Sequence, residues 1–238
     1  MVLLGLIALA VSEYALAYRM QNNINMNFEV VMHAYERIAE IQKVAFHVRT
    51  LTFLKQNIFT NYGGLTQTQF MTSLQDEMRV SLDTLYYLQN DVVLSPLPVS
   101  AAQERLMNDK VTLLYFRETS GANTTIAFSL TEAMMQMQSS VFTISNLALD
   151  VFDEATSEDV YFYMANSMND LLQALFDSGR LYVQALLDED HGYRQSFVAI
   201  FACSLGLLLV SFVMLVPAVW SVSEINFKVL SLFCEISR

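Results

Sequence analysis

The residue types that could do chemistry are few in this sequence of 238 residues, and they lie far apart. The three histidines are His33, His47 and His191, and none belongs to an HExxH pattern or lies near a pair of cysteines. A zinc site needs three or four such ligands at characteristic spacings. The acidic run at residues 188–190 does not replace them, because consecutive helical residues point in different directions. The sequence therefore predicts no metal site.

Motifs for nucleotide, cofactor or acyl-transfer chemistry are also missing from the sequence. The chain contains neither a GxxxxGK[ST] loop nor a GxGxxG loop, and it contains no GxSxG sequence. We therefore predict no catalytic residue, no bound cofactor and no enzymatic activity.

Two residues remain as candidates for contacting a ligand. His47 and Arg49 are close in sequence within a predicted helix, where their side chains could contact an anionic ligand. A surface pair without a ligand explains the same two residues, and the sequence leaves both interpretations open.

One sequence for covalent modification is present. Asn123-Thr124-Thr125 is the only N-x-Ser/Thr sequence of the chain, and it follows residues typical of a turn. Glycosylation of Asn123 would place this region on the exoplasmic side of a membrane. The two cysteines, Cys203 and Cys234, both lie outside residues 20–195, so no disulfide is predicted in that segment.

The elements that position these residues are organised around an apolar stretch at residues 196–220. It contains no charged residue and no histidine. As a helix it would be about 37 Å long, which exceeds the ~30 Å hydrocarbon core of a bilayer. Tyr193, Arg194 and Trp220 lie at its ends, where interfacial anchors are expected. We predict a transmembrane helix here.

Residues 1–18 predict a second transmembrane helix. Glu13 interrupts this apolar run, at a cost of about 2.5–3.5 kcal/mol near mid-bilayer. A signal peptide is the alternative, but no basic residues precede the apolar run. No helix breaker lies around Arg19, so one helix is predicted to continue to about Phe59, where Asn61-Tyr-Gly-Gly would end it.

Between the two apolar stretches, the hydrophobic spacing predicts four long amphipathic helices and one β-hairpin at residues 111–128. On the first helix, the apolar stripe comprises Phe28, Val31, Tyr35, Ile38, Ile41, Ala45, Val48 and Leu51, whereas Glu29, Glu36, Arg37, Glu40 and Lys43 are expected on other faces. The remaining helices are predicted at residues 66–92, at 101–108 after Ser100, from the capping box Ser129–Glu132 to about Phe152, and after Ser157.

The predicted fold is mainly α, with two transmembrane helices flanking an up-down four-helix bundle and a small β-hairpin insertion. The predicted domains are a transmembrane helix at 1–18, an extracellular or luminal bundle at 19–195, a transmembrane helix at 196–220 and the start of a cytosolic region at 221–238. We expect the native chain to continue beyond these residues.

The charge distribution bears on possible partners. Residues 20–195 contain 21 acidic and 10 basic side chains, which accounts for the whole net charge of −11. A nucleic-acid partner is excluded on this basis, because phosphate binding requires a basic face. The acidic surface is either simply solvated or a docking site for a basic partner.

Three stretches resemble a known family. They are Arg37-Ile-Ala-Glu-Ile-Gln-Lys-Val-Ala-Phe-His-Val-Arg-Thr-Leu51, Lys228-Val-Leu-Ser-Leu-Phe-Cys-Glu-Ile236 and Asp159-Val-Tyr-Phe-Tyr-Met-Ala-Asn-Ser167. They are similar to the tiny macrocysts family, which comprises large multi-pass membrane proteins of protists that often carry PAS domains. The resemblance implies a fragment with a luminal or extracellular domain between two spans, in a sensing or signalling protein. PAS domains would lie outside this fragment, and the resemblance transfers no ligand-binding residue.

These observations support two functional hypotheses. The first is a sensor or receptor segment, in which a helical ectodomain passes a ligand or partner signal through two transmembrane helices. The second is a structural or assembly subunit of a membrane protein complex. In both, the chain is an integral protein of the plasma membrane or an organelle membrane, with the lipid bilayer and other proteins or a second copy of itself as partners.

Overall fold

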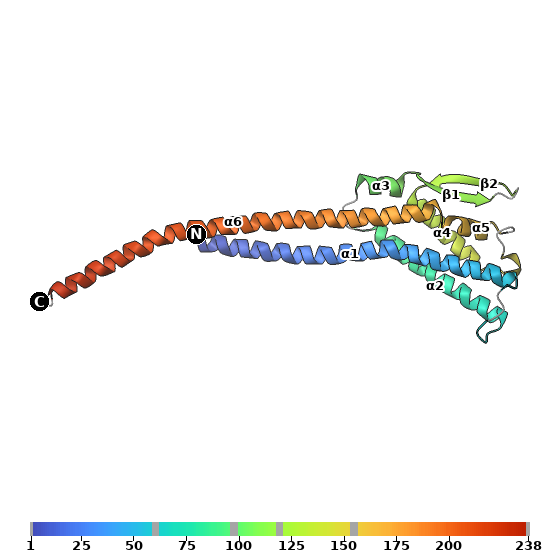
Figure 1. Cartoon of the computed structure of the whole chain (residues 1–238), viewed down its shortest axis with the longest axis horizontal. Helices are drawn as coiled ribbons and strands as arrows, with labels where there is room; N and C mark the ends of the chain where they lie inside the picture. The colour runs from blue at the N-terminus through green and yellow to red at the C-terminus, as the bar shows by residue number, and fades with distance from the viewer. Residues whose placement is uncertain (1, 59–61, 96–99, 118–120, 153–156, 237–238) are drawn as a thin grey trace. The chain divides into compact units, whose positions relative to one another are not determined.

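The computed structural model describes residues 2–58, 62–95, 100–117, 121–152 and 157–236, and most of them are helical (Figure 1). The chain forms two compact units, Met1–Ile24 with Glu189–Arg238, and Asn25–Asp188. We call these the terminal unit and the central unit. In chain order the elements are α1 (Val2–Lys55), α2 (Gln67–Val93), α3 (Ala101–Asn108), β1 (Thr112–Arg117), β2 (Asn123–Phe128), α4 (Leu130–Ile144), the 3-10 turn η1 (Leu149–Val151), α5 (Glu158–Asn166) and α6 (Asp170–Ile236).

The predicted β-hairpin is confirmed. β1 pairs antiparallel to β2, with Thr112 opposite Phe128 and Arg117 opposite Asn123. Both strands are rich in the β-branched and aromatic residues that fit a pleated surface. Asn123 is exposed at the start of β2, next to a turn in which residues 118–120 lie outside the described part of the chain.

The helix starts follow the capping signals in the sequence. Ser129 accepts from the Glu132 backbone N–H while the Glu132 carboxylate accepts from the Ser129 backbone N–H, which completes the predicted capping box of α4. That backbone hydrogen bond lowers the pKa of Glu132. Ser100 and Ser157 accept the equivalent bonds at the starts of α3 and α5, as predicted.

Helix α1 runs through Arg19 without a break, but it ends before the predicted residue. Asn57 adopts the left-handed conformation with φ 57°. The backbone N–H of Ile58 bonds to the Phe53 carbonyl and that of Asn57 bonds to the Leu54 carbonyl. This pair of bonds is a Schellman motif, and asparagine is the residue other than glycine that most often allows it. The helix therefore ends at Lys55. Of the predicted terminator Asn61-Tyr-Gly-Gly, Asn61 lies outside the described residues.

The predicted third helix is too long by about two turns. α4 ends at Ile144, and the stretch to Phe152 contains the separate turn η1. Asn146 folds back to donate to the Phe142 carbonyl, at 2.7 Å. Short polar side chains that bond to the nearby backbone in this way compete with helix continuation.

The predicted fourth helix is two helices, α5 and α6. Asn166 ends α5, and its side chain is used elsewhere, since its amide bonds both the N–H and the carbonyl of Tyr115 on β1. The Ser167 carbonyl accepts from the Gln42 side chain of α1. These side-chain bonds satisfy backbone groups between the two helices, so the chain can leave the helical path after Asn166.

An apolar core joins all the helices of the central unit and β1. Its buried members include Ile41, Val48, Met78, Leu85, Leu114, Met134, Val141, Phe152, Tyr163 and Leu175. The predicted stripe of α1 is largely correct, but Phe28 and Tyr35 are 53% and 37% exposed. Arg37, which the sequence places on another face, is 0% exposed. The structure confirms a mainly helical fold, and the up-down four-helix arrangement stays a prediction.

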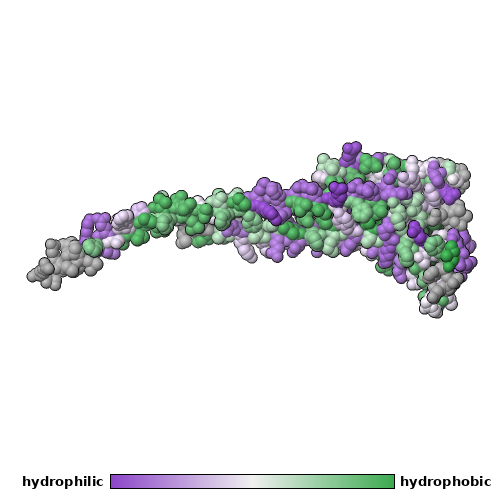
Figure 2. Space-filling model, viewed as in Figure 1, coloured by the Kyte–Doolittle hydropathy of each residue, from purple (hydrophilic) through white to green (hydrophobic). Residues whose placement is uncertain are grey.

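The terminal unit contains one candidate membrane span, and not the predicted two. In the described part of the chain, only the segment Asp170–Lys228 of α6 contains a window long and apolar enough to cross a bilayer. Large apolar side chains are exposed along it, and Figure 2 shows this hydrophobic surface. The first apolar run is shorter than the ~20 residues that a span needs, and Glu13 interrupts it.

Candidate ligand site at a buried arginine

The most unusual side chain of the central unit is Arg37. Its Nη1 donates to Gln89 Oε1 of α2 at 2.6 Å, and its Nη2 lies 3.5 Å from Ser178 Oγ of α6. Gln103 Nε2 of α3 donates to the same Ser178 Oγ at 3.2 Å. Nearby, Tyr182 of α6 donates its hydroxyl to the Val92 carbonyl at 3.0 Å. We call Arg37, Gln89, Gln103, Ser178 and Tyr182 the arginine cluster.

The arginine cluster holds a positive charge without a negative partner. Within the described residues, no carboxylate forms an ion pair with Arg37, and its hydrogen-bond acceptors are neutral. Burial lowers the pKa of Arg37 to about 10, while the nearby Tyr182 acts in the opposite direction. The guanidinium therefore remains charged at neutral pH. A buried charge normally requires a paired counter-charge, so this arrangement costs stability.

Several polar atoms of the cluster lack partners among the described residues. Arg37 Nε and Gln89 Nε2 are buried N–H donors without an acceptor, and Gln103 Oε1 is a buried acceptor without a donor. Native proteins satisfy almost all such atoms, so three in one cluster require an explanation. They give this region unused hydrogen-bonding capacity.

A hollow of about 390 Å³ adjoins the cluster, and we call it the α3 hollow. Gln103 and Tyr182 belong both to its lining and to the arginine cluster. Burial raises the pKa of Tyr182, so its hydroxyl stays protonated at neutral pH, and it donates its one hydrogen to the Val92 carbonyl. The remaining lining residues are Val93, Glu104, Met107, Asn108 and Thr131. Mostly apolar walls with a few convergent polar groups are typical of small-ligand sites.

The hydrophobic spacing of α1 contains a signal for the burial of Arg37. Ala34, Arg37, Ile41, Val44 and Val48 follow one another at alternating spacings of three and four, and all five are buried. The hydrophobic pattern thus places position 37 inside the core, where its charge is an exception. The charge of its side chain led to the wrong assignment.

The structure does not bring the two ligand candidates His47 and Arg49 together. His47 is 5% exposed, and its Nε2 lies 3.2 Å from Glu77 Oε2 of α2. Burial lowers the pKa of His47, although the charge of Glu77 acts against that shift. Arg49 is exposed on another side of α1. His47 therefore lies at a helix interface, without Arg49 as a neighbour in a common site.

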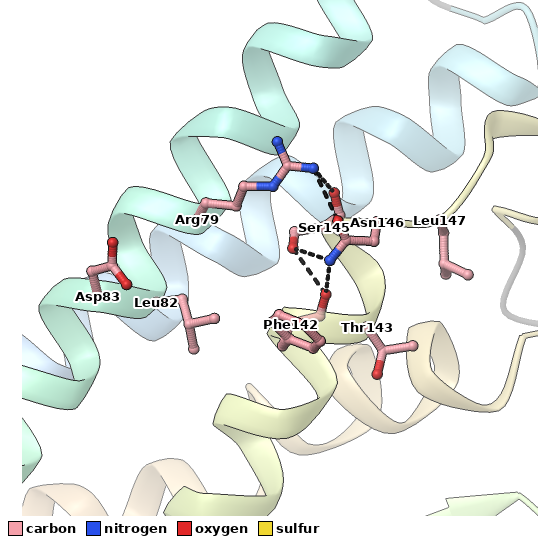
Figure 3. Close-up of a pocket in the computed structure, with 8 residues that line it drawn as sticks. All are labelled: Arg79, Leu82, Asp83, Phe142, Thr143, Ser145, Asn146 and Leu147. Atoms are coloured by element: carbon pink, nitrogen blue, oxygen red, sulfur yellow. Dashed lines mark hydrogen bonds between the residues drawn. The ribbon is translucent and has the colours of Figure 1, made fainter.

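A second hollow, of about 660 Å³, lies between α2 and the end of α4 (Figure 3). Arg79 lies at its edge and bonds to Asp76, to the Ser145 carbonyl and to Asn146 Oδ1. A cation on the last carbonyls of a helix acts as a C-cap. The polar contacts in Figure 3 thus stabilise the end of α4, and they give this hollow no comparable set of unpaired atoms.

In the terminal unit, polar contacts join α1 to α6. Ser204 Oγ donates to Glu13 Oε1 at 3.2 Å, and Asn23 Nδ2 donates to the Tyr193 hydroxyl at 2.8 Å. Among the described residues, no group of three or more His, Cys, Asp or Glu side chains converges, and the run at residues 188–190 belongs to no such group. Comparisons with protein-family models, curated proteins and solved structures gave no match, so the resemblance to the tiny macrocysts family stays a prediction.

Proposed function

We propose that this chain is a membrane-anchored sensor segment. In this proposal, the central unit binds a ligand at the α3 hollow, and the arginine cluster converts binding into a shift of α6. The observation that carries the proposal is the buried, uncompensated Arg37. A protein tolerates such a cost mainly where function requires it.

The helices that meet at Arg37 support this direction of signalling. Arg37 lies on α1, and Ser178 and Tyr182 lie on α6. These are the two helices that also supply residues to the terminal unit, and α6 includes the candidate span. A shift of α6 at Ser178 can therefore act on later residues of the same helix, because a continuous helix transmits displacement along its axis.

The test is amide hydrogen exchange on the full chain in lipid nanodiscs. Arg37→Met removes the charge and the hydrogen bond from Arg37 to Ser178 of α6, so the cluster loses this link to α6. We expect altered exchange at residues 189–195, which follow the central unit on α6, as well as near Ser178. Val44→Ala is the matched control, since it changes a buried residue of α1 outside the cluster. Exchange changes in Arg37→Met that stop at Ser178 would contradict the sensor proposal.

We also propose that the central unit is extracellular or luminal. The exposed Asn123 supports this location, because an N-x-Ser/Thr sequence is glycosylated only on that side of a membrane. The test is expression into sealed microsomes with added protease. We expect a glycan on Asn123 that the Asn123→Gln variant lacks, or protection of residues 25–188 from the protease. Digestion of that segment would instead place it in the cytosol.

An assembly subunit is the second candidate function. Val80, Tyr87, Met135 and Phe142 are each more than 60% exposed in the central unit. Apolar side chains of this size on a surface are typical of contacts with a partner protein. Purification in mild detergent distinguishes the candidates: a stoichiometric partner, together with no ligand response, would favour assembly over sensing.

A further inference from the structure

We propose that the central unit pairs with a second copy of itself through one exposed apolar surface. This inference goes beyond the sensor proposal, and it rests on the proposed function only for the point that the chain is anchored in a membrane. The surface consists of five residues of α1 and one of α6, each between 37% and 66% exposed. We call it the α1/α6 face, and its members are Phe28, Met32, Tyr35, Phe46, Phe53 and Phe176.

The α1 residues of this face follow the heptad spacing of a coiled coil. Successive apolar positions are separated alternately by four and three residues in the order Phe28, Met32, Tyr35 and Ala39, and the same series reaches Phe46 and Phe53. Gln42 and Arg49 occupy the two intervening positions. Such a seam packs against a second helix with the same repeat. The opposite side of α1 is buried in the core, at Val44 and Val48 among others. A helix that is apolar on two sides is expected to be covered on both.

Helix α6 extends this surface within the central unit. The ring of Tyr35 lies directly over Gly179 of α6, where a Cβ atom would be 3.0 Å from Tyr35 Cζ. Gln42 of α1 also donates to the Ser167 carbonyl, shortly before α6 begins. Phe176 lies one helical turn before Gly179 and is exposed, so it adds to the apolar surface beside Tyr35.

The area of the α1/α6 face is sufficient for a dimer. An aromatic side chain carries roughly 150–250 Å² of surface, so six large side chains that are about half exposed offer about 500–600 Å² per copy. Pairing of two copies therefore covers about 1,100 Å² in total, which exceeds the roughly 1,000 Å² that a specific interface needs.

The charge around the face allows identical copies to approach each other. The whole chain has a net charge of −11, so contact between two copies of an acidic surface is opposed by repulsion. None of the six residues of the α1/α6 face is charged. The exposed charged residues of α1 in the central unit are two acids and two bases, Glu29, Glu36, Lys43 and Arg49, whose charges cancel. Depletion of charge at the centre is typical of protein interfaces.

A second copy in the same membrane is the occupant that this face fits. Two copies anchored in one membrane have the same direction, so α1 of one copy can lie parallel to α1 of the other around a two-fold axis. Equal heptad positions then meet, and Phe46 lies beside its counterpart in the second copy. Confinement to a membrane raises the local concentration of the copies, which favours an interface of modest area. An unrelated partner would need the same heptad pattern on a helix of its own.

The first test is the mass of the full chain in mild detergent, measured by size exclusion with light scattering. We expect a protein mass of twice 27.0 kDa. Phe46→Gln should raise the dissociation constant of the dimer by about 10- to 100-fold, as the loss of an aromatic residue at the centre of an interface does. Phe142→Gln is the matched control, because Phe142 is also more than 60% exposed but lies on α4, and it should leave the dimer unchanged.

The second test locates the contact in membranes. The substitutions Cys203→Ser and Cys234→Ser remove both native thiols from the chain. Phe46→Cys in this background places one thiol at a heptad position, where parallel pairing brings it beside its counterpart. Mild oxidation should then give a disulfide-linked dimer. Phe142→Cys in the same background should give none.

The outcomes decide between this dimer and other occupants. A cross-linked dimer of Phe46→Cys in the membrane supports the proposal. A monomer in detergent together with no cross-link overturns it, and so does a dimer that Phe46→Gln leaves intact, since the contact then lies elsewhere. A cross-link from Phe46→Cys to a different protein would also overturn it. The exchange experiment on Arg37→Met follows α6 within one copy, so a failure of the sensor proposal is distinguishable from a failure of the dimer.

Discussion

Two arginines of the central unit lie beside the two hollows, and their surroundings differ in kind. Arg79 has a side chain that is 48% exposed, and it bonds to the Asp76 carboxylate, to the Ser145 carbonyl at the end of α4 and to Asn146 Oδ1. Arg37 is 0% exposed and bonds to an amide and a hydroxyl group. These acceptors balance the charge of Arg79 and tie it to the end of α4, which accounts for its position without a ligand. The acceptors of Arg37 leave its charge unbalanced, and this difference makes the Arg37 region the better candidate for a ligand.

The largest effect is expected from Arg37→Ala. This substitution leaves a cavity in the core and removes the donor from Gln89, so the free energy of unfolding should fall by about 2–5 kcal/mol. Denaturant unfolding of the full chain in mild detergent measures it. A loss below about 1 kcal/mol would mean that the site collapses without cost.

The double variant Arg37→Met with Gln89→Leu should remove this loss. It replaces a buried charge and its acceptor with apolar side chains of similar length, and such exchanges are often neutral or stabilising by about 1–4 kcal/mol. The same unfolding measurement applies. A double variant as unstable as Arg37→Ala would show that the charge itself stabilises the fold, and the comparison with Arg79 would lose its basis.

Arg79→Ala should have a smaller effect, about 0.5–1.5 kcal/mol, because the groups released at the end of α4 become accessible to water. Asp83→Ala on the same side of α2 serves as the control, since Asp83 lines the same hollow. Hydrogen exchange should increase at the last turn of α4 in Arg79→Ala alone. An equal increase in both variants would refute the capping role.

The smallest effect is expected from pH, through His47. Because burial lowers the pKa of His47, the unfolded chain binds a proton first as the pH falls. The stability contributed by His47 is thus complete above its unfolded pKa of about 6.5 and is lost as the pH falls toward the folded value. His47→Gln should flatten the stability profile between pH 7 and pH 5. A profile as steep as that of the wild-type chain would assign this dependence to other groups.

Much of the fold was predictable because it depends on local signals. The hairpin follows from β-formers around a turn, and the starts of α3, α4 and α5 follow from serine caps. The predicted ends of α1 and α4 were wrong. Asn57 and Asn146 stop these helices through hydrogen bonds with the backbone, which helical periodicity does not reveal. The division of α5 from α6 depends on Asn166 meeting Tyr115, which lies 51 positions earlier in the sequence.

The sequence alone was enough to predict that this protein is mainly helical, that residues 196–220 lie in a segment able to span a bilayer, and that Asn123 lies beside a hairpin turn. These features follow from composition, hydrophobic spacing and turn residues within short stretches. The burial of Arg37 with Gln89, Gln103 and Ser178, and the divergence of His47 from Arg49, required the packed structure. Four helices, α1, α2, α3 and α6, supply the residues around Arg37, and the charge balance of a buried group depends on all of them together.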